Sequence, residues 1–243
     1  MYRGSDMQKQ LIECYEAFKA SNDFDDSLSG ELTAPLLLSV TERWQASKRR
    51  VLVIGQETMG WGFDPVHDWC GFKGHDDSIQ TLVNGYRSFE FARNNPKNHR
   101  SPFWRAYRHF REVLGDEQDG IDTSVLWTNL FRMSISGCSV IKEGTPEEVE
   151  QLRNASRDVL HAELRILQPT AVIFFTGPNY DGNLDAVFPG LERSSFDEFD
   201  RRTVAQLTHP SLPTKAWRTY HPAYLQRSGQ WQIINTISDQ LLR

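Results

Sequence analysis

The sequence has 243 residues, a formal net charge of −5, and hydrophobic and charged fractions of 39% and 24%. This composition is ordinary for a globular protein, and no apolar run approaches the roughly 20 residues that a membrane-spanning helix needs. The N-terminal segment also lacks the apolar centre of a signal peptide. We therefore expect a cytoplasmic protein that makes no contact with a membrane.

The cysteines exclude two further classes of protein. There are three of them, Cys14, Cys70 and Cys138, which is too few for a four-thiolate cluster and the wrong number for a disulfide framework. Cys70 lies between His67 and His75, but this spacing fits no standard zinc pattern. We expect reduced thiols, no metal and no cofactor.

The first half of the chain contains one clear helix and one clear strand. Apolar residues at helical spacing predict a helix over residues 6–20, and an acidic loop follows at 21–30. The continuous apolar run at residues 51–54 is typical of a strand buried on both faces. Residues 60–74 have the composition of a loop that is rich in aromatic side chains.

The second half alternates between helices and strands. Ser101 followed by Pro102 predicts a helix start, and Gly115 its end. The capping box that begins at Thr145 opens a long helix, which Pro169 ends. Further strands are predicted at 124–128, 170–175, 203–208 and 216–220, and a closing helix at 231–242. This alternation predicts a single α/β domain whose mainly parallel sheet is covered on both faces.

Three polar segments follow strands of this sheet, where ligands of such folds bind. Gly55 lets the backbone turn sharply after the first strand and presents Gln56 and Glu57. Asn129 follows the second strand, and His221 follows the last. Alternatively, the acid is a solvated turn residue, the amide a helix cap and the imidazole a structural histidine.

Together these residue types suit the cleavage of the bond between a base and a sugar. A carboxylate such as Glu57 can stabilise the cationic sugar and activate water. The carboxamide of Asn129 offers an acceptor and donors to the edge of a base. The imidazole of His221 can stabilise negative charge on the departing base.

Two assignments have competitors within the sequence. His209 also precedes a proline, but we prefer His221 because a helix follows it directly and Leu225 lies four residues further on. Phe72 could stack on an extruded base, with Trp61 or Trp69 as alternatives, whereas core packing is the simpler explanation for each of these aromatic rings.

Positive charge is concentrated in two stretches, despite the negative total. These stretches could follow a phosphate backbone, or they could be two solvated faces. The first carries Arg93, Lys97, Arg100, Arg105, Arg108 and Arg111, and the second carries Arg201, Arg202, Lys215, Arg218, Arg227 and Arg243.

The three segments, taken in order, resemble the motifs of the uracil-DNA glycosylase superfamily. Gly55-Gln56-Glu57 is similar to the family's Gly-Gln-Asp start, Val125–Leu130 to its base-binding segment with asparagine, and His221–Leu225 to its His-Pro-Ala-Ala-Leu motif. The resemblance spans residues 51–243 and leaves 1–50 as an N-terminal helical extension. It implies a three-layer α/β/α fold with a four-stranded sheet, and a monomeric enzyme.

The resemblance also implies roles for individual residues. Glu57 would activate water and His221 would stabilise the leaving base, while Gly55, Gln56, Phe72 and Asn129 would bind the base. Leu225 would enter the duplex as the nucleotide flips out, with Arg218 and Arg227 near the DNA.

The first motif departs from the family's pattern in ways that change the expected substrate. Thr58 and Met59 replace a proline and a tyrosine, and the tyrosine excludes bases with a 5-methyl group. We therefore expect excision of uracil or of a larger modified pyrimidine. A hypermodified base of phage DNA is one such pyrimidine, and its excision would make this a defence enzyme. Two alternatives stay open: a non-catalytic protein that binds DNA or a nucleobase, and an unrelated α/β enzyme that binds a nucleotide at Gly55.

Overall fold

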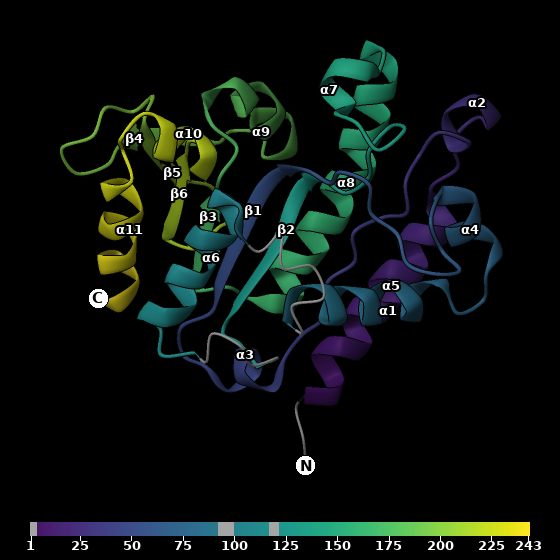
Figure 1. The fold of residues 1–243 in the computed structure, drawn as a ribbon, viewed down its shortest axis with the longest axis horizontal. Coiled ribbons are helices and arrows are strands. Elements are labelled where there is room, and N and C mark those ends of the chain that lie inside the picture. The colour runs from purple at the N-terminus through teal and green to yellow at the C-terminus, as the bar shows by residue number, and fades with distance from the viewer. Residues whose placement is uncertain (1–3, 92–99, 117–121) are drawn as a thin grey trace. The chain divides into compact units, whose positions relative to one another are not determined.

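The computed structural model describes residues 4–91, 100–116 and 122–243, and it shows an α/β fold (Figure 1). A six-stranded, mostly parallel sheet is flanked by helices. The chain divides into two compact units, and each is built from three segments. Unit 1 comprises Met1–Val40, Glu57–Ser88 and Thr128–Leu167, and unit 2 comprises Thr41–Gln56, Phe89–Trp127 and Gln168–Arg243. Residues 41–50, which the sequence assigned to an N-terminal extension, thus belong to unit 2.

The sheet has the strand order β2-β1-β3-β6-β5-β4. β3 pairs in parallel with β1 and with β6, whereas β5 is antiparallel to both β6 and β4. The four-stranded sheet implied by the resemblance was therefore wrong, because β5 and β4 extend the sheet to six strands. Of these two, β5 corresponds to the predicted segment 203–208, whereas β4 was not predicted. The strands are β1 (Val51–Glu57), β2 (Val125–Phe131), β3 (Ala171–Phe174), β4 (Glu192–Ser195), β5 (Val204–Thr208) and β6 (Lys215–Thr219).

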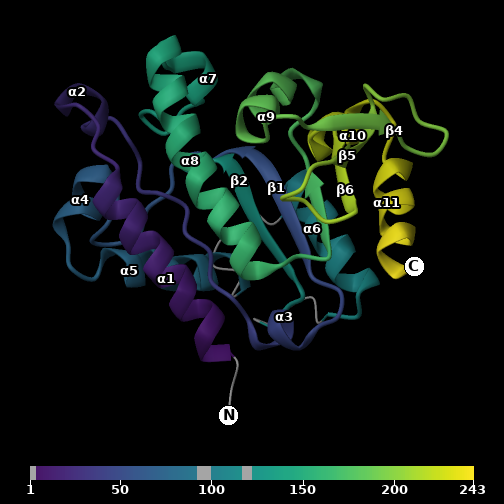
Figure 2. The ribbon, with the colours of Figure 1, turned by 180° about the vertical axis from the view of Figure 1, so that it is seen from behind.

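Unit 2 covers both faces of its strands with aromatic side chains. Phe175 contacts Phe103 and Phe110 with ring centroids 6.0 and 6.1 Å apart, whereas the preceding Phe174 contacts Phe188 at 5.8 Å. Neighbouring residues of an extended chain point to opposite faces, so helix α6 covers one face and the end of α9 the other. α6 lies on the viewer's side of the strands in Figure 1 and beyond them in Figure 2. The helices of unit 2 are α3 (Glu42–Ala46), α6 (Pro102–Val113), α9 (Asp181–Val187), α10 (Pro222–Arg227) and α11 (Gln232–Leu242), with a 3₁₀ turn at Pro178–Tyr180.

Unit 1 is held together by a buried polar network between α1 and α8. The Tyr15 hydroxyl donates a hydrogen bond of 2.8 Å to Glu163, and Glu163 forms an ion pair with Arg132. All three side chains are inaccessible to solvent, which makes the network a structural element. The helices of unit 1 are α1 (Gly4–Ser21), α2 (Asp26–Ser29), α4 (Trp69–Gly74), α5 (Ser78–Tyr86), α7 (Val140–Glu143) and α8 (Pro146–Leu167), and a π-helical turn, Arg87–Phe91, follows α5.

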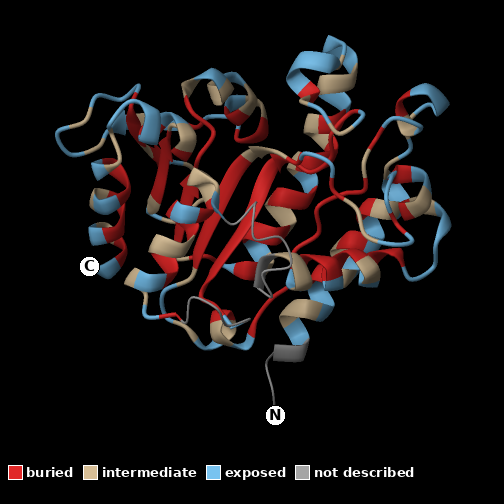
Figure 3. Ribbon diagram, in the orientation of Figure 1, coloured by how far each residue is buried: buried red, intermediate tan, exposed pale blue. Residues whose placement is uncertain are grey.

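The elements with a strong apolar period were predicted within a few residues of their observed bounds. The buried strands and the inward faces of the helices are red in Figure 3. α4 forms within the expected aromatic loop because Asp68 caps it, accepting from the N–H of Gly71. β4 was missed because its sequence, Glu-Arg-Ser-Ser, has no apolar residue.

Candidate functional site

The glycine and the amide of the first motif lie in unit 2. Gly55 is buried within β1, and Gln56 is half-buried at the carboxyl end of this strand. The side-chain Nε2 of Gln56 donates a hydrogen bond of 2.8 Å to the carbonyl of Thr176, just after β3. This bond fixes Gln56 at the strand ends, where α/β folds bind their ligands.

His221 lies two residues after β6 and forms the N-cap of α10. Its Nδ1 accepts a hydrogen bond of 3.2 Å from the backbone N–H of Ala223. The imidazole stacks on Phe103, with ring centroids 6.0 Å apart and an angle of 19° between the rings. Burial lowers the pKa of His221 below its ordinary value of 6.5, so the ring is neutral at pH 7.

These contacts determine which ring nitrogen carries the proton. A nitrogen that accepts a hydrogen bond is unprotonated, so the proton of the neutral His221 ring is on Nε2. No residue in the described part of the chain accepts a hydrogen bond from this Nε2. His221 is therefore a neutral donor at the carboxyl edge of the sheet in unit 2.

The competing histidine lies at the other edge of the sheet. His209 follows β5, and β5 runs antiparallel to β6, with Val204 opposite Thr219. The end of β5 is therefore beside the start of β6. Both nitrogens of His209 make contacts there, with the carbonyl of Pro189 at 3.2 Å and the N–H of Ser211 at 3.1 Å.

The predicted acid, Glu57, and the amide predicted to bind the base, Asn129, lie in unit 1. Glu57 ends β1, and its Oε2 accepts a hydrogen bond of 2.9 Å from the N–H of Val140. The next residue, Thr58, accepts a hydrogen bond of 3.1 Å from Nδ2 of Asn129. Thr58 therefore connects the segment that carries the carboxylate to the segment that carries the amide.

Phe72 lies in the core of unit 1. It is fully buried, and its ring packs against Phe18 and Trp69. Trp69 is 2% exposed and Trp61 is 7% exposed, so neither alternative presents an open ring. All three aromatic residues fit the simpler explanation of core packing.

Two of the residues expected at the DNA are buried in unit 2. Leu225 has no exposed surface, so it cannot enter a duplex from this position. Arg218 is 1% exposed, and its guanidinium faces Asp181 and donates to the carbonyls of Arg201 and Arg202. We therefore assign both residues to the structure of unit 2.

The exposed side chains of α10 are instead Tyr224, Gln226 and Arg227. Tyr224 is 39% exposed and stacks on Tyr220, with ring centroids 4.3 Å apart. The guanidinium of Arg227 lies over the Tyr224 ring, 5.5 Å from its centroid. Sequence reasoning passed over Tyr224 because the family motif directed attention to the leucine that follows it.

The two basic stretches are only partly open to solvent. Arg93 and Lys97 lie outside the described residues. Arg105 is exposed on α6, where it bonds Gln226 at 2.7 Å and lies over the ring of Trp231, whereas Arg111 is buried. The stretches are therefore mixed surfaces, and their exposed cations are Arg100, Arg105, Arg201, Arg202, Arg227 and Arg243.

The cysteine and histidine positions form no metal site among the described residues, where no group of three candidate ligands occurs. His67 lies 3.7 Å from Asp64, and Cys70 and Cys138 are exposed thiols. Burial raises the pKa of Cys14 to about 11, so this thiol stays protonated. In the same described part of the chain, no helix is both long and apolar enough to cross a membrane.

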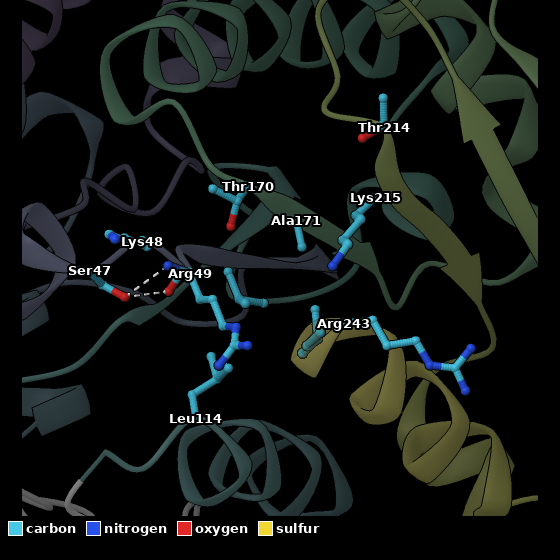
Figure 4. Close-up of a pocket in the computed structure, with 11 residues that line it drawn as sticks. Ser47, Lys48, Arg49, Leu114, Thr170, Ala171, Thr214, Lys215 and Arg243 are labelled. Carbon is cyan, nitrogen blue, oxygen red and sulfur yellow. Dashed lines mark hydrogen bonds between the residues drawn. The ribbon is translucent and has the colours of Figure 1, made fainter.

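A basic pocket of about 630 Å³ lies at the amino ends of β1, β3 and β6, in unit 2 (Figure 4). Lys48, Arg49, Lys215 and Arg243 line it. Arg49 donates to the carbonyl of Leu242 at 2.6 Å and Lys215 to that of Gln240 at 2.8 Å. These two cations thus satisfy the last carbonyls of α11, which is an ordinary structural role, and we assign the pocket no ligand.

No protein-family model matches this sequence, and no curated protein matches it either. The case for a function therefore depends on the side chains themselves and on the resemblance in their motifs.

Proposed function

We propose that the protein is a monofunctional DNA glycosylase with a uracil-DNA glycosylase-like fold, which excises a pyrimidine base and leaves an abasic site. The observation that carries the proposal is the state of His221. Its ring is neutral and has its proton on Nε2, because burial lowers its pKa and Ala223 occupies Nδ1. Such a donor stabilises negative charge on a leaving base without having to lose its own proton.

The proposed reaction is the hydrolysis of one N-glycosidic bond. Water attacks C1′ of the sugar, and the electron pair of the C1′–N bond passes to the base. A carboxylate orients the water and accepts its proton, which is the role that the motif resemblance gives to Glu57. Nε2 of His221 is the donor that we propose for a carbonyl oxygen of the departing base. The base then takes up a proton, so the products are a neutral free base and an abasic sugar, without any metal or cofactor.

The substrate is uracil or a larger pyrimidine that carries a 5-substituent. Met59 occupies the place of the tyrosine that excludes such groups in the uracil enzymes. It is 60% exposed, and Gly60 follows it with a φ of 63°. A flexible side chain beside a glycine is a weaker barrier than a rigid ring. Hypermodified phage DNA is one source of such bases, which supports a role in defence.

The DNA surface is assigned to the exposed side chains around His221. Tyr224 presents a partly exposed aromatic side chain, and Arg105 and Arg227 provide positive charge within the same unit. Aromatic faces stack on unpaired bases, while arginines neutralise phosphates. We propose that the protein acts on DNA as a monomer.

A non-catalytic nucleobase-binding protein is the second candidate, and one observation favours it. Glu57 replaces the aspartate of the family, and its Oε2 is already bonded to the N–H of Val140. A displacement of about 1 Å in a catalytic group can cost on the order of 100-fold in rate. If Glu57 is catalytic, Glu57→Gln abolishes base release; if the protein only binds, this variant leaves DNA affinity unchanged and the natural protein releases nothing.

The deciding experiment measures base release from oligonucleotides that carry uracil, mismatched thymine or glucosylated hydroxymethylcytosine. We expect release from at least one of them, and loss of release in His221→Ala and in Asn129→Ala. His209→Ala is the matched control, because this histidine also precedes a proline but follows the antiparallel strand β5. Inactivity of the natural protein on all three oligonucleotides would count against a glycosylase, as would equal losses in the two histidine variants.

A further inference from the structure

We infer that Thr58 is a positioning residue that fixes the side-chain amide of Asn129, so that the site selects between 4-keto and 4-amino pyrimidines. The inference rests on the proposed function and names the chemical group by which that site would choose its base. Thr58 stands where the family motif has a proline, which has no hydroxyl group.

The hydroxyl of Thr58 is both a donor and an acceptor of hydrogen bonds. It donates a hydrogen bond of 3.0 Å to the carbonyl of Phe131, and its oxygen accepts one of 3.1 Å from Nδ2 of Asn129. The backbone N–H of Thr58 donates to the same Phe131 carbonyl at 3.1 Å. Thr58 is 2% exposed and Asn129 is 8% exposed, so water competes poorly for these groups.

This pair of hydrogen bonds determines which end of the Asn129 amide faces Thr58. A hydroxyl has a single hydrogen, and here it points at the Phe131 carbonyl, so the oxygen can only accept from Asn129. The opposite amide orientation would bring Oδ1 against the hydroxyl oxygen and require the hydroxyl to release Phe131. One hydrogen bond of this kind corresponds to a preference of about fivefold.

The fixed orientation leaves Asn129 with a defined pattern toward a ligand. Within the described part of the chain, nothing donates to its Oδ1, which is therefore open as an acceptor, and Nδ2 keeps a second N–H. A 4-keto pyrimidine such as uracil has an acceptor at position 4 and a donor at N3. A 4-amino pyrimidine such as cytosine has the reverse, so an amide that cannot rotate pairs at both atoms with one type only.

Thr58 could instead serve only the fold, by satisfying the carbonyl of Phe131 at the end of β2. That role predicts a loss of stability in Thr58→Val but no change in the choice of base. The two roles therefore predict different effects of Thr58→Val on one ratio. This ratio is kcat/KM for a 4-keto base divided by kcat/KM for the 4-amino base with the same 5-substituent.

The experiment measures this ratio on two matched pairs, uracil with cytosine and 5-hydroxymethyluracil with 5-hydroxymethylcytosine, each in the same oligonucleotide. We expect Thr58→Val to bring the ratio about fivefold closer to one, and Thr58→Ser, which retains the hydroxyl, to preserve it. Thr128→Val is the matched control, because this buried threonine of β2 has a hydroxyl with no hydrogen-bond partner among the described residues.

A second measurement follows the amide itself, without any substrate. In the natural protein, NMR should show one Asn129 side-chain amide proton that exchanges slowly with solvent, and Thr58→Val should abolish this protection. Base release with an unchanged ratio in folded Thr58→Val would overturn the inference and leave the proposed function intact. Failure of the natural protein to release a base from either pair would overturn the specificity role, and failure on the wider panel as well would overturn the proposed function.

Discussion

Replacement of His221 separates the structural from the chemical contribution of this residue. The ring has two structural contacts, the cap on the Ala223 N–H and the stack on Phe103. Loss of an N-cap costs about 1 kcal/mol, and loss of an aromatic pair costs about 0.5–1.5 kcal/mol. We therefore expect His221→Ala to lower the free energy of unfolding by about 1.5–2.5 kcal/mol, the sum of these two costs.

His221→Asn provides the comparison, because asparagine is also a good N-cap residue. This variant should lose only the stacking contribution, about 0.5–1.5 kcal/mol. Both variants lack the Nε2 donor, so the kcat of both should fall by a factor on the order of 10²–10³. Urea unfolding gives the stabilities, and single-turnover base release gives the rates. A rate in His221→Asn within a few fold of the natural protein would refute the proposed role of the ring, whatever the stability.

The remaining predictions concern stability, pH and DNA affinity. Glu163→Gln leaves Arg132 buried without its counter-charge and should cost about 3–5 kcal/mol in urea unfolding, whereas Glu150→Gln, exposed on the same helix, should cost almost nothing. The pKa of His221 is lower in the folded protein than in the unfolded chain, because the folded ring is buried. As the pH falls below 6.5, the unfolded chain therefore binds a proton at this histidine before the folded protein does, and the free energy of unfolding decreases. Urea unfolding between pH 7.5 and 5 should show this loss in the natural protein, and an equal loss in His221→Asn would contradict it. Tyr224→Ala should weaken binding of an oligonucleotide by about 1–3 kcal/mol in a titration. The lost stack on Tyr220 should lower the free energy of unfolding by about 0.5–1.5 kcal/mol, and unchanged DNA affinity would remove Tyr224 from the DNA surface.

The sequence by itself determined the long periodic elements. α8 and α11 follow from apolar residues at helical spacing, and β1, β2 and β3 from continuous apolar runs. These patterns are local, because the spacing of apolar residues within one helix or strand indicates which of its faces is buried. The sequence also indicated that Gln56 and His221 would lie at the carboxyl ends of strands, because the order of elements implied a parallel sheet.

Only the tertiary structure decided which polar and aromatic residues remain available for chemistry. Leu225, Phe72 and Arg218 match useful residue types, but their burial depends on neighbours that are distant in sequence. The choice of His221 over His209 depends on the antiparallel pairing of β5 with β6, which puts the two histidines at opposite edges. The bond between Thr58 and Asn129 joins residues 71 positions apart, and no local pattern encodes such a contact. Periodicity records burial along one element, whereas the partner of a side chain is fixed only when separate elements pack together.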